Sequence, residues 1–183
     1  MKQTRRFILL LAISSLWHCQ SAEKKPDLKT LVVPAKSDGK NPYYSRTDTA
    51  TLNLPDSVWK KVLPDSVFKV ARLKATERAF TGKFWNSTFL GTYYCAACGN
   101  RLFRSDAKFA SSCGWPSFFE TFRKTSVHYE VDNTHGMTRT EVLCGRCNGH
   151  LGHLFDDGPA PSHHRYCMNS IAMDFVPELK TGL

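Results

Sequence analysis

The sequence has 183 residues, of which 42% are hydrophobic and 22% are charged, and this length is enough for one domain with a hydrophobic core and an additional segment. The formal net charge is +9, but the Lys and Arg residues are scattered along the chain and do not form a block. We therefore interpret them as a solvated basic surface and expect no nucleic-acid partner.

The first 18 residues are predicted to be a signal peptide. Residues 1–6 are basic, and residues 7–17 are almost wholly apolar. A helix of about 11 residues spans roughly 16 Å, which is too short for a hydrocarbon core of about 30 Å. A basic start before a short apolar stretch is instead typical of secretory signals. We therefore expect an exported protein.

Cys19 lies where the signal of a bacterial lipoprotein would be cleaved and its cysteine acylated. The local match is poor, because Trp17 and His18 are bulky where small residues are usual. Two alternatives remain: a lipid anchor at Cys19, or an ordinary cleaved signal in which Cys19 has no role. The protein is thus expected in the periplasm of a bacterium or on a membrane as a lipoprotein.

The rest of the chain divides into three segments. Residues 19–52 are polar, contain three Pro residues and one Gly, and have no sustained periodicity, which predicts a linker between the membrane and the domain. Residues 53–178 are expected to form the folded domain, and residues 179–183 a short C-terminal tail. We expect this domain to be a monomer.

The best helical candidate is residues 56–78, at the start of the domain. An Asp-Ser pair at 56–57 and another at 65–66 each provide an N-cap before apolar residues at helical spacing. Pro64 separates the two parts, because a proline disfavours the helical conformation of the residue before it, here Leu63. We therefore expect two short helices.

After Gly82 the pattern changes to short apolar runs bounded by Gly, Asn, Asp and Pro, which predicts strands. Residues 132–136 are predicted to form a hairpin loop between two of these strands. Short strands joined by turns predict a mainly β, antiparallel architecture with a short N-terminal helical segment. The expected strands are residues 93–96, 101–103, 127–131, 137–143 and 165–175.

Two Cys-x-x-Cys pairs share one local pattern, Cys95 with Cys98 and Cys144 with Cys147. The spacing lets both sulfurs of a pair reach one ion, and the Gly or Asn directly after each pair tolerates the left-handed conformation of such a turn. Four thiolates suit one tetrahedral zinc ion, which would stabilise the fold without catalysing, because no coordination position stays open. Since the gap between the pairs is wide, we expect the two knuckles to clamp separate parts of one sheet.

A disulfide framework and a redox Cys-x-x-Cys are the alternatives for these four cysteines in an exported chain. Two near-copies of one knuckle argue against both. A thioredoxin-type motif also occurs once, between a strand and a helix, and this sequence shows no such context. We therefore expect a structural zinc ion.

Cys167 lies in the expected strand of residues 165–175. Alternation along a strand places Arg165, Cys167 and Asn169 on one face, together with Ile171 and Met173. A guanidinium group beside a cysteine favours the thiolate, which is the nucleophilic form. On spacing alone, a buried inert cysteine and a reactive one are equally supported.

Two histidines and a further isolated cysteine add chemically active groups. His150 and His153 directly follow the second knuckle, but four thiolates already saturate zinc, so we favour a role in proton chemistry over metal binding. Cys113 lies two residues before Trp115. A Trp beside Pro usually packs in a core, whereas an exposed indole beside a reactive thiol can cradle a methyl or thioether group.

These residues occur in strings that closely resemble the B-type methionine sulfoxide reductases, which reduce the R epimer of methionine sulfoxide. The resemblance extends from about residue 54 to residue 175, in the family's order. Each string alone is modest, but together they are highly specific. They are Phe80-Thr-Gly82, Cys95-x-x-Cys98-Gly, Cys113-Gly-Trp115-Pro-Ser-Phe, His135-Gly-Met-x-Arg-Thr-Glu-Val, Cys144-x-x-Cys147, His150-Leu-Gly-His153-x-Phe-x-Asp157-Gly-Pro and Arg165-Tyr-Cys167-x-Asn169-Ser.

The resemblance implies a role for each matched position. Cys167 would be the nucleophile and Cys113 the resolving cysteine, and Trp115 would face the methyl group of the substrate. The implied fold is a mainly β domain of two antiparallel sheets, in agreement with the expected strands. The sulfoxide site would be lined by His150, His153, Asp157, Arg165 and Asn169, and zinc would be bound by Cys95, Cys98, Cys144 and Cys147.

The sequence departs from the family pattern in three places. Ala79 and Asp156 stand where many members have proline, and His163-His164 precede Arg165 where smaller or aliphatic residues are common. The first two are loop changes. We interpret the two histidines as exposed loop residues without a role, with an effect on the pKa of Cys167 or adventitious metal binding as the alternatives.

The implied reaction repairs oxidised methionine, in proteins or free, after oxidative stress. The Cys167 thiolate would attack the sulfoxide sulfur while an acid, with His153 as first candidate and His150 as second, protonates the oxygen. Cys167 would become a sulfenic acid, and Cys113 would condense with it to a disulfide. A thioredoxin-like dithiol would then restore both thiols.

Two other functions compete with this one. A zinc-ribbon module that binds nucleic acid or a protein explains the four paired cysteines and the basic pI, but not Cys113, Cys167 or the histidines. A zinc-stabilised structural lipoprotein would hold the remaining cysteines in a fixed disulfide. Salt-dependent DNA binding would favour the first, and rapid reduction by thioredoxin would count against the second.

Overall fold

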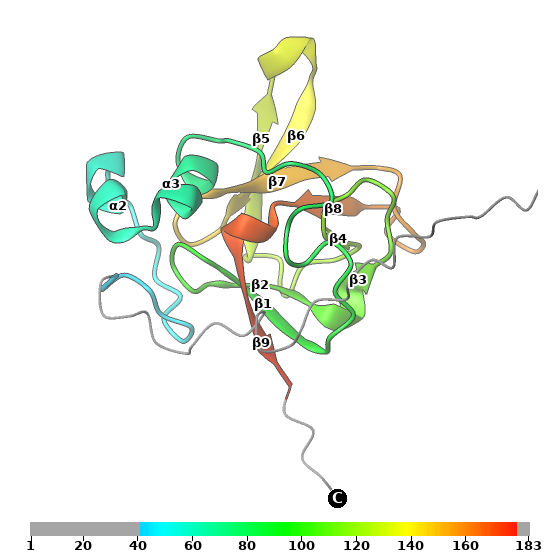
Figure 1. The fold of residues 1–183 in the computed structure, drawn as a ribbon, viewed down its shortest axis with the longest axis horizontal. Coiled ribbons are helices and arrows are strands. Elements are labelled where there is room, and N and C mark those ends of the chain that lie inside the picture. Colours follow the sequence, from blue (N-terminus) through cyan, green and yellow to red (C-terminus); the bar gives the residue numbers. More distant parts are fainter. Residues whose placement is uncertain (1–40, 179–183) are drawn as a thin grey trace, which may run out of the picture.

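The computed structural model describes residues 41–178, and the expected signal peptide, Cys19 and the C-terminal tail lie outside the described residues. The domain is mainly β with two antiparallel sheets and two short helices, as predicted (Figure 1). The three-stranded sheet has the order β2-β1-β9. Its members are β1 (Gly91–Cys95), β2 (Arg101–Arg104) and β9 (Met173–Pro177).

The second sheet has six strands in the order β3-β4-β8-β7-β6-β5, and every neighbouring pair is antiparallel. Three 3₁₀ turns, η1 (Ser105–Ala107), η2 (Thr134–Gly136) and η3 (Ser170–Ala172), lie between strands. The six strands are β3 (Lys108–Phe109), β4 (Ser117–Phe118), β5 (Val127–Asp132), β6 (Arg139–Cys144), β7 (His150–Phe155) and β8 (Arg165–Met168).

Two helices precede the sheets, α2 (Asp56–Val62) and α3 (Asp65–Ala71). The predicted N-caps are wrong, because Pro55 and Pro64 occupy the cap positions and make no side-chain cap bond. The aspartates lie one residue later, in the first turns, where a carboxylate interacts favourably with the helix dipole. Leu63 has an extended backbone, as its place before a proline predicts, and the second helix ends well before residue 78.

The expected strand of residues 165–175 is wrong as a single element. It consists of β8 in the larger sheet, the turn η3, and β9 in the smaller sheet. The chain leaves the six-stranded sheet after Met168, at the end of β8. The predicted alternation therefore holds for Arg165 and Cys167 and does not extend to Ile171 and Met173. This change of sheet lets one continuous stretch connect the two layers (Figure 1).

Aromatic side chains fill the space between the two sheets. Phe103 of β2 stacks on Phe118 of β4 at a centroid distance of 4.3 Å, and Tyr93 of β1 meets the same Phe118 edge-on at 5.0 Å. All three side chains are completely buried. Full burial of one such side chain stabilises a fold by about 1.5–3 kcal/mol, so this layer is a main part of the core.

Residues 41–52 belong to the folded domain, although the sequence places them in a polar linker. The buried Arg146 holds them through bonds from Nε to the Ala50 carbonyl at 3.1 Å, from Nη1 to the Tyr43 carbonyl at 2.9 Å and from Nη2 to Asp48 at 2.6 Å. The peptide N–H of Leu52 donates to the Arg146 carbonyl at 2.7 Å. Arg146, which lies between Cys144 and Cys147, therefore organises a segment that has no hydrophobic pattern of its own.

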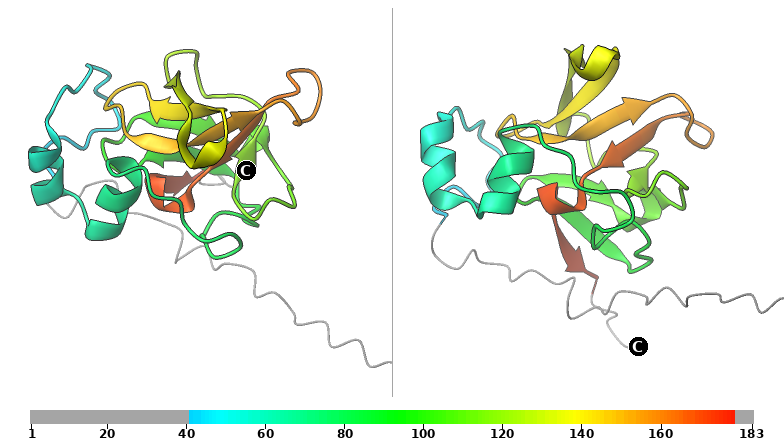
Figure 2. Two further views of the ribbon diagram at one scale, coloured as in Figure 1. Left: turned by 90° about the horizontal axis from the view of Figure 1, so that it is seen from above. Right: turned by 45° about the horizontal axis from the view of Figure 1, so that its top comes forward.

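The β5–β6 hairpin projects from the body of the domain, and both views of Figure 2 show it beside β7. Its strands pair from Val127 with Cys144 to Asp132 with Arg139, and η2 closes the predicted loop. Among residues 41–178, no helix has the length and apolar character needed to cross a bilayer.

Candidate functional site

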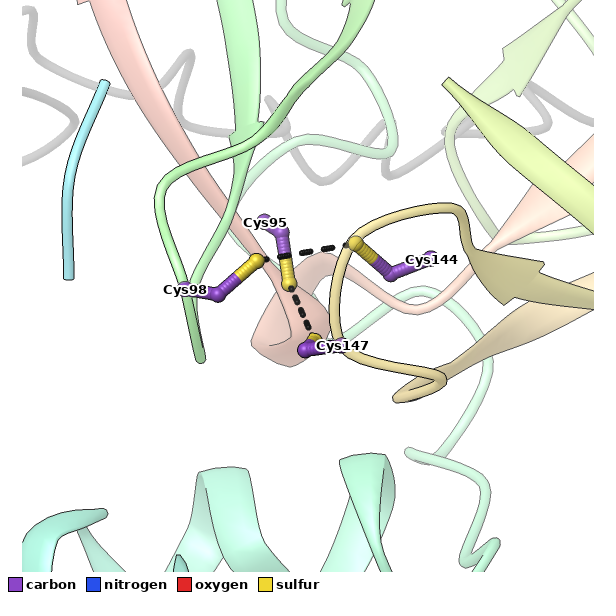
Figure 3. Close-up of side chains that lie close together, drawn as sticks. All are labelled: Cys95, Cys98, Cys144 and Cys147. Carbon is purple, nitrogen blue, oxygen red and sulfur yellow. Dashed lines mark hydrogen bonds between the residues drawn. The ribbon is translucent and has the colours of Figure 1, made fainter. Parts of the chain in front are cut away.

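The four paired cysteines lie together in a buried cluster (Figure 3). The sulfurs of Cys95 and Cys147 are 3.8 Å apart, those of Cys98 and Cys144 are 3.6 Å apart, and all four lie within 4.8 Å of one another. Tetrahedral zinc with Zn–S bonds of about 2.3 Å requires sulfur separations of about 3.8 Å. The donor set and its spacing therefore fit one tetrahedral metal ion.

The two knuckles have the predicted local conformation but a different placement. Gly99 and Asn148, directly after the two pairs, both have positive φ, at 79° and 57°. The first knuckle follows β1 in the smaller sheet, and the second follows β6 in the larger sheet. The expectation that both clamp one sheet is wrong, because each pair closes the end of a strand in a different layer. The cluster therefore joins the two sheets.

Neighbouring side chains support the knuckles. Arg72, at the end of α3, donates through Nη1 to the Cys147 carbonyl at 2.8 Å. The buried Asn100 donates through Nδ2 to the Ser126 carbonyl at 3.0 Å and lies 3.6 Å from the Cys144 sulfur. Such contacts orient ligand-bearing loops before a metal binds.

Cys113 and Cys167 form a second, separate pair of sulfurs 3.6 Å apart. β8 carries Cys167, and Cys113 lies in the loop before β4, which pairs with β8 through Ser117 and Cys167. Both cysteines are partly exposed, unlike the four of the metal cluster. A fold-imposed contact between cysteines 54 positions apart in sequence brings them close to the separation needed for a disulfide.

The two thiols of this pair have opposite pKa shifts. The hydrogen bond from Cys167 lowers the pKa of Cys113 to about 4, and contacts with Ser111 and Ser117 act in the same direction. The same hydrogen bond, together with burial, raises the pKa of Cys167, and the charge of Arg165 only partly opposes it. The pair thus holds one negative charge and one proton, and moving that proton to Cys113 leaves the thiolate on Cys167.

Cys167 opens into a cavity of about 110 Å³. Trp115, His153 and Asn169 also line this cavity. The Trp115 indole is fixed by a bond from Nε1 to the Glu77 carbonyl at 3.1 Å. The lining is completed by Thr76, Arg139, Gly152, Phe155 and Met168.

His153 on β7 lies opposite Cys167 on the neighbouring strand β8, and its ring is hydrogen-bonded to the carboxylate of Asp132. The residues oppose each other in the β7–β8 register. His153 Nε2 lies 2.8 Å from Oδ2 of Asp132, and Arg139 Nη2 bonds the same oxygen at 2.6 Å. Nε of Arg139 is buried and has no hydrogen-bond partner among the described residues.

His150 is not among the residues that line the cavity and is almost completely buried. Its Nδ1 is hydrogen-bonded to Oε1 of Glu141 at 2.7 Å, and Lys74 pairs with the other carboxylate oxygen at 2.7 Å. Burial lowers the pKa of His150 against the opposing effect of Glu141. A buried imidazole with a depressed pKa is a poor proton donor near neutral pH, which favours His153 for that task.

Asp157 and Arg165 form a bidentate ion pair, with distances of 2.7 and 2.9 Å, at the exposed side of β8. The guanidinium of Arg165 also lies over the Phe155 ring, 4.4 Å from its centroid. Neither residue lines the cavity, but Phe155 does. The pair therefore bounds the site through Phe155. His163 and His164 belong to the β7–β8 loop and do not line the cavity either.

Four residues around the site had no predicted role. Asp132, Glu141 and Glu77 contact predicted site residues, and Arg139 bonds Asp132 and lines the cavity. Arg139 and Glu141 belong to the matched string that begins at His135, so the family resemblance could have indicated them. Asp132 was predicted only as the start of a hairpin loop. The Glu77 carboxylate was not predictable from its surroundings in sequence, because its partners, Ser170 and Ile171, lie 93 and 94 residues later in the chain.

Comparison with known proteins identifies related sequences. A model of the SelR domain family matches residues 63–177. The chain is 50% identical over 123 residues to a peptide methionine sulfoxide reductase MsrB from Thiobacillus denitrificans, covering 67% of this chain and 93% of that protein. Proteins of the same name from Agrobacterium fabrum and Leptospira interrogans are 49% and 48% identical over 126 and 127 residues, covering 69% of this chain in both cases and 93% and 97% of those proteins.

Proposed function

The chain belongs to the SelR-domain family of MsrB methionine sulfoxide reductases, and we propose that it reduces the R epimer of methionine sulfoxide through a Cys167 sulfenic acid. The observation that carries the proposal is the 3.6 Å approach of the Cys113 and Cys167 sulfurs beside a cavity that Trp115 and His153 share with Cys167. A thioether-sized group fits such a space, and an indole face suits its methyl group.

The first step is attack of the Cys167 thiolate on the sulfoxide sulfur while His153 transfers a proton to the oxygen. The substrate sulfur gains two electrons and leaves as methionine, the Cys167 sulfur loses two, and the oxygen becomes the hydroxyl of a sulfenic acid. Cys113 then condenses with this group, which forms a disulfide and releases water. The existing sulfur contact supports this second step, because only a small shift is needed for bonding.

An external dithiol must reduce the disulfide, and we assign this task to a thioredoxin-like protein. The proposed substrate class is oxidised methionine, either within proteins or as the free amino acid. Asn169, Asp157 and Arg165 are proposed to shape the site, Asn169 at the cavity wall and the ion pair through Phe155.

The four-cysteine cluster is proposed to bind one structural zinc ion through Cys95, Cys98, Cys144 and Cys147. Its four buried thiolates leave no position for a substrate, and its sulfur separations match tetrahedral coordination. When bound, zinc supplies a cross-link between the ends of β1 and β6. The chemistry at Cys167 is assigned to the separate pair.

A turnover assay on separated epimers tests the activity. We expect methionine to form from the R epimer and not from the S epimer. Cys167→Ser should abolish a single turnover, whereas Cys113→Ser should release one methionine per chain and then fail to cycle with thioredoxin. Equal turnover of both epimers would contradict the stereochemistry, and normal cycling of Cys113→Ser would contradict the resolving role.

We also propose that the protein is exported and, through Cys19, anchored to a bacterial membrane as a lipoprotein. The basic and apolar pattern of residues 1–17 and the position of Cys19 support this location. Labelled fatty acid should be incorporated into the wild-type chain and not into Cys19→Ser. Labelling of neither chain, with export retained, would indicate an ordinary cleaved signal.

A further inference from the structure

We propose that Asp132 is a positioning residue of the active site, whose carboxylate holds the His153 imidazole so that Nδ1 is the ring nitrogen that serves the sulfoxide oxygen. This inference rests on the proposed role of His153 as the acid. It extends the site to the projecting β5–β6 hairpin, which contributes Asp132 and Arg139 (Figure 2).

Asp132 reaches His153 because of the pairing of three neighbouring strands. Asp132 opposes Arg139 across β5 and β6, and Glu141, two residues after Arg139, opposes His153 across β6 and β7. Side chains two residues apart in a strand share a face, so Asp132 and His153 lie on the same face of the sheet. Their side chains are only 11% and 12% exposed, which protects the 2.8 Å contact from competing water.

Asp132 is itself fixed by three further hydrogen bonds. Its Oδ1 accepts from the Thr134 N–H at 2.9 Å and from the Thr134 hydroxyl at 2.6 Å, and its Oδ2 also accepts from Arg139. These donors, with Thr134 the largest contributor, hold the pKa of Asp132 well below its usual range. An ionised carboxylate only accepts hydrogen bonds, so the Nε2 atom of His153 must carry the hydrogen between them.

This arrangement determines which nitrogen can act. Nδ1 of His153 has no protein partner among the described residues, whereas Nε2 is engaged by Asp132. A protonated imidazole would donate from Nδ1 and then remain as the neutral form with hydrogen on Nε2. The bond to Asp132 is therefore the same before and after proton transfer, and the ring needs no reorientation during the reaction.

The same carboxylate also holds Arg139, which lines the cavity and has a buried, unpartnered Nε atom. One side chain thus orients two cavity-lining donors. Loss of Asp132 should leave the cavity walls made by Trp115 and Phe155 in place, since neither contacts the hairpin carboxylate. The expected defect is one of proton transfer and not of substrate binding.

The experiment compares Asp132→Ala, which removes the acceptor, with Asp132→Asn, which keeps an acceptor oxygen and removes the charge. The first-turnover rate constant at saturating R-epimer sulfoxide should fall about tenfold to a hundredfold in Asp132→Ala and less in Asp132→Asn. The half-saturating substrate concentration should stay within about twofold of wild type. Thr138→Ala, which removes a bond to Asn133 in the same loop, is the control and should turn over normally.

A spectroscopic measurement separates this role from a structural one. The ¹H–¹⁵N signal of the His153 Nε2–H group, assigned by its loss in His153→Gln, should be present in wild type and Asp132→Asn and absent in Asp132→Ala. If Asp132→Ala does not fold, the signal and the first-turnover rate constant of Asp132→Asn decide the matter.

The proposal is overturned if wild type lacks the signal, if Asp132→Ala keeps it, or if the first-turnover rate constant of Asp132→Ala is unchanged. Failure of the proposed function would look different, because wild type would then release no methionine or His153→Gln would be fully active.

Discussion

At the scale of single residues, Glu77 connects three parts of the active site. Its carboxylate accepts from the peptide N–H groups of Ser170 at 2.6 Å and Ile171 at 3.0 Å, directly after the strand that carries Cys167. Its own N–H donates to Asn169 at 2.9 Å, and its carbonyl accepts from Trp115. Glu77 therefore holds the turn that follows the nucleophile and two cavity walls in one arrangement.

Glu77→Gln should weaken this arrangement. The amide has one acceptor oxygen, so its NH₂ group would face one of the two peptide N–H groups, of which Ser170 is buried and Ile171 partly buried, and leave it unpaired. An unpaired buried donor costs about 1–3 kcal/mol, and we expect a loss of this size in the free energy of unfolding, together with a slower first turnover. Denaturant unfolding and single-turnover kinetics measure the two effects.

Glu178→Gln is the matched control for this prediction, because Glu178 forms a half-exposed surface pair with Arg104. Such pairs contribute about 0–1 kcal/mol, so that variant should be close to wild type. A stability loss in Glu77→Gln no larger than in Glu178→Gln would show that the buried carboxylate is not needed for the turn.

Residues with a repeated spacing were predictable, and residues with distant partners were not. The cluster of Cys95, Cys98, Cys144 and Cys147 follows from two copies of one knuckle, and the positive φ of Gly99 and Asn148 follows from their residue types. Cys113 and Cys167 were placed in one site only by the resemblance. Asp132 and Glu77 depend on strand pairing and on a turn 90 residues away, which no local pattern records.

At the scale of elements, β3, β4 and β7 were missed, and the other strands were predicted at least in part. The predicted hairpin of residues 127–143 matches β5, η2 and β6 closely. β3 and β4 have two residues each, which is too few to show a period of two. β7 was not predicted because its apolar residues, Leu151, Leu154 and Phe155, do not alternate with polar residues.

The break between β8 and β9 has a physical cause that lies outside the segment. Residues 165–175 have a strand-like composition throughout, and a single strand would satisfy it. The Glu77 carboxylate instead captures the N–H groups of Ser170 and Ile171, which fixes η3 and directs β9 into the other sheet. Gly82 permits this, because a Cβ atom there would lie only 2.4 Å from both the Glu77 carboxylate and the Ser170 hydroxyl.

At the scale of the whole molecule, two sets of side chains lie between the two sheets, in addition to the β8–η3–β9 stretch that passes from one sheet to the other. The aromatic layer around Phe103 and Phe118 fills the space between them, and the cysteine cluster joins the end of β1 to the end of β6. Arg146 adds residues 41–52 to the same end of the domain. With the proposed metal bound, the cluster would cross-link the two layers, and its loss should affect both sheets together.

Removal of the metal should destabilise the whole domain. We expect about one zinc ion per purified chain, and its loss after chelation or in Cys144→Ser. Because a structural zinc site contributes its binding free energy to folding, the loss should be a large part of a total stability of about 5–15 kcal/mol. Amide hydrogen exchange should become faster in β1 and in β6, which belong to different sheets. Cys113→Ser removes a thiol outside the cluster and should keep both the zinc and the protection, whereas faster exchange confined to one sheet of Cys144→Ser would contradict the cross-link.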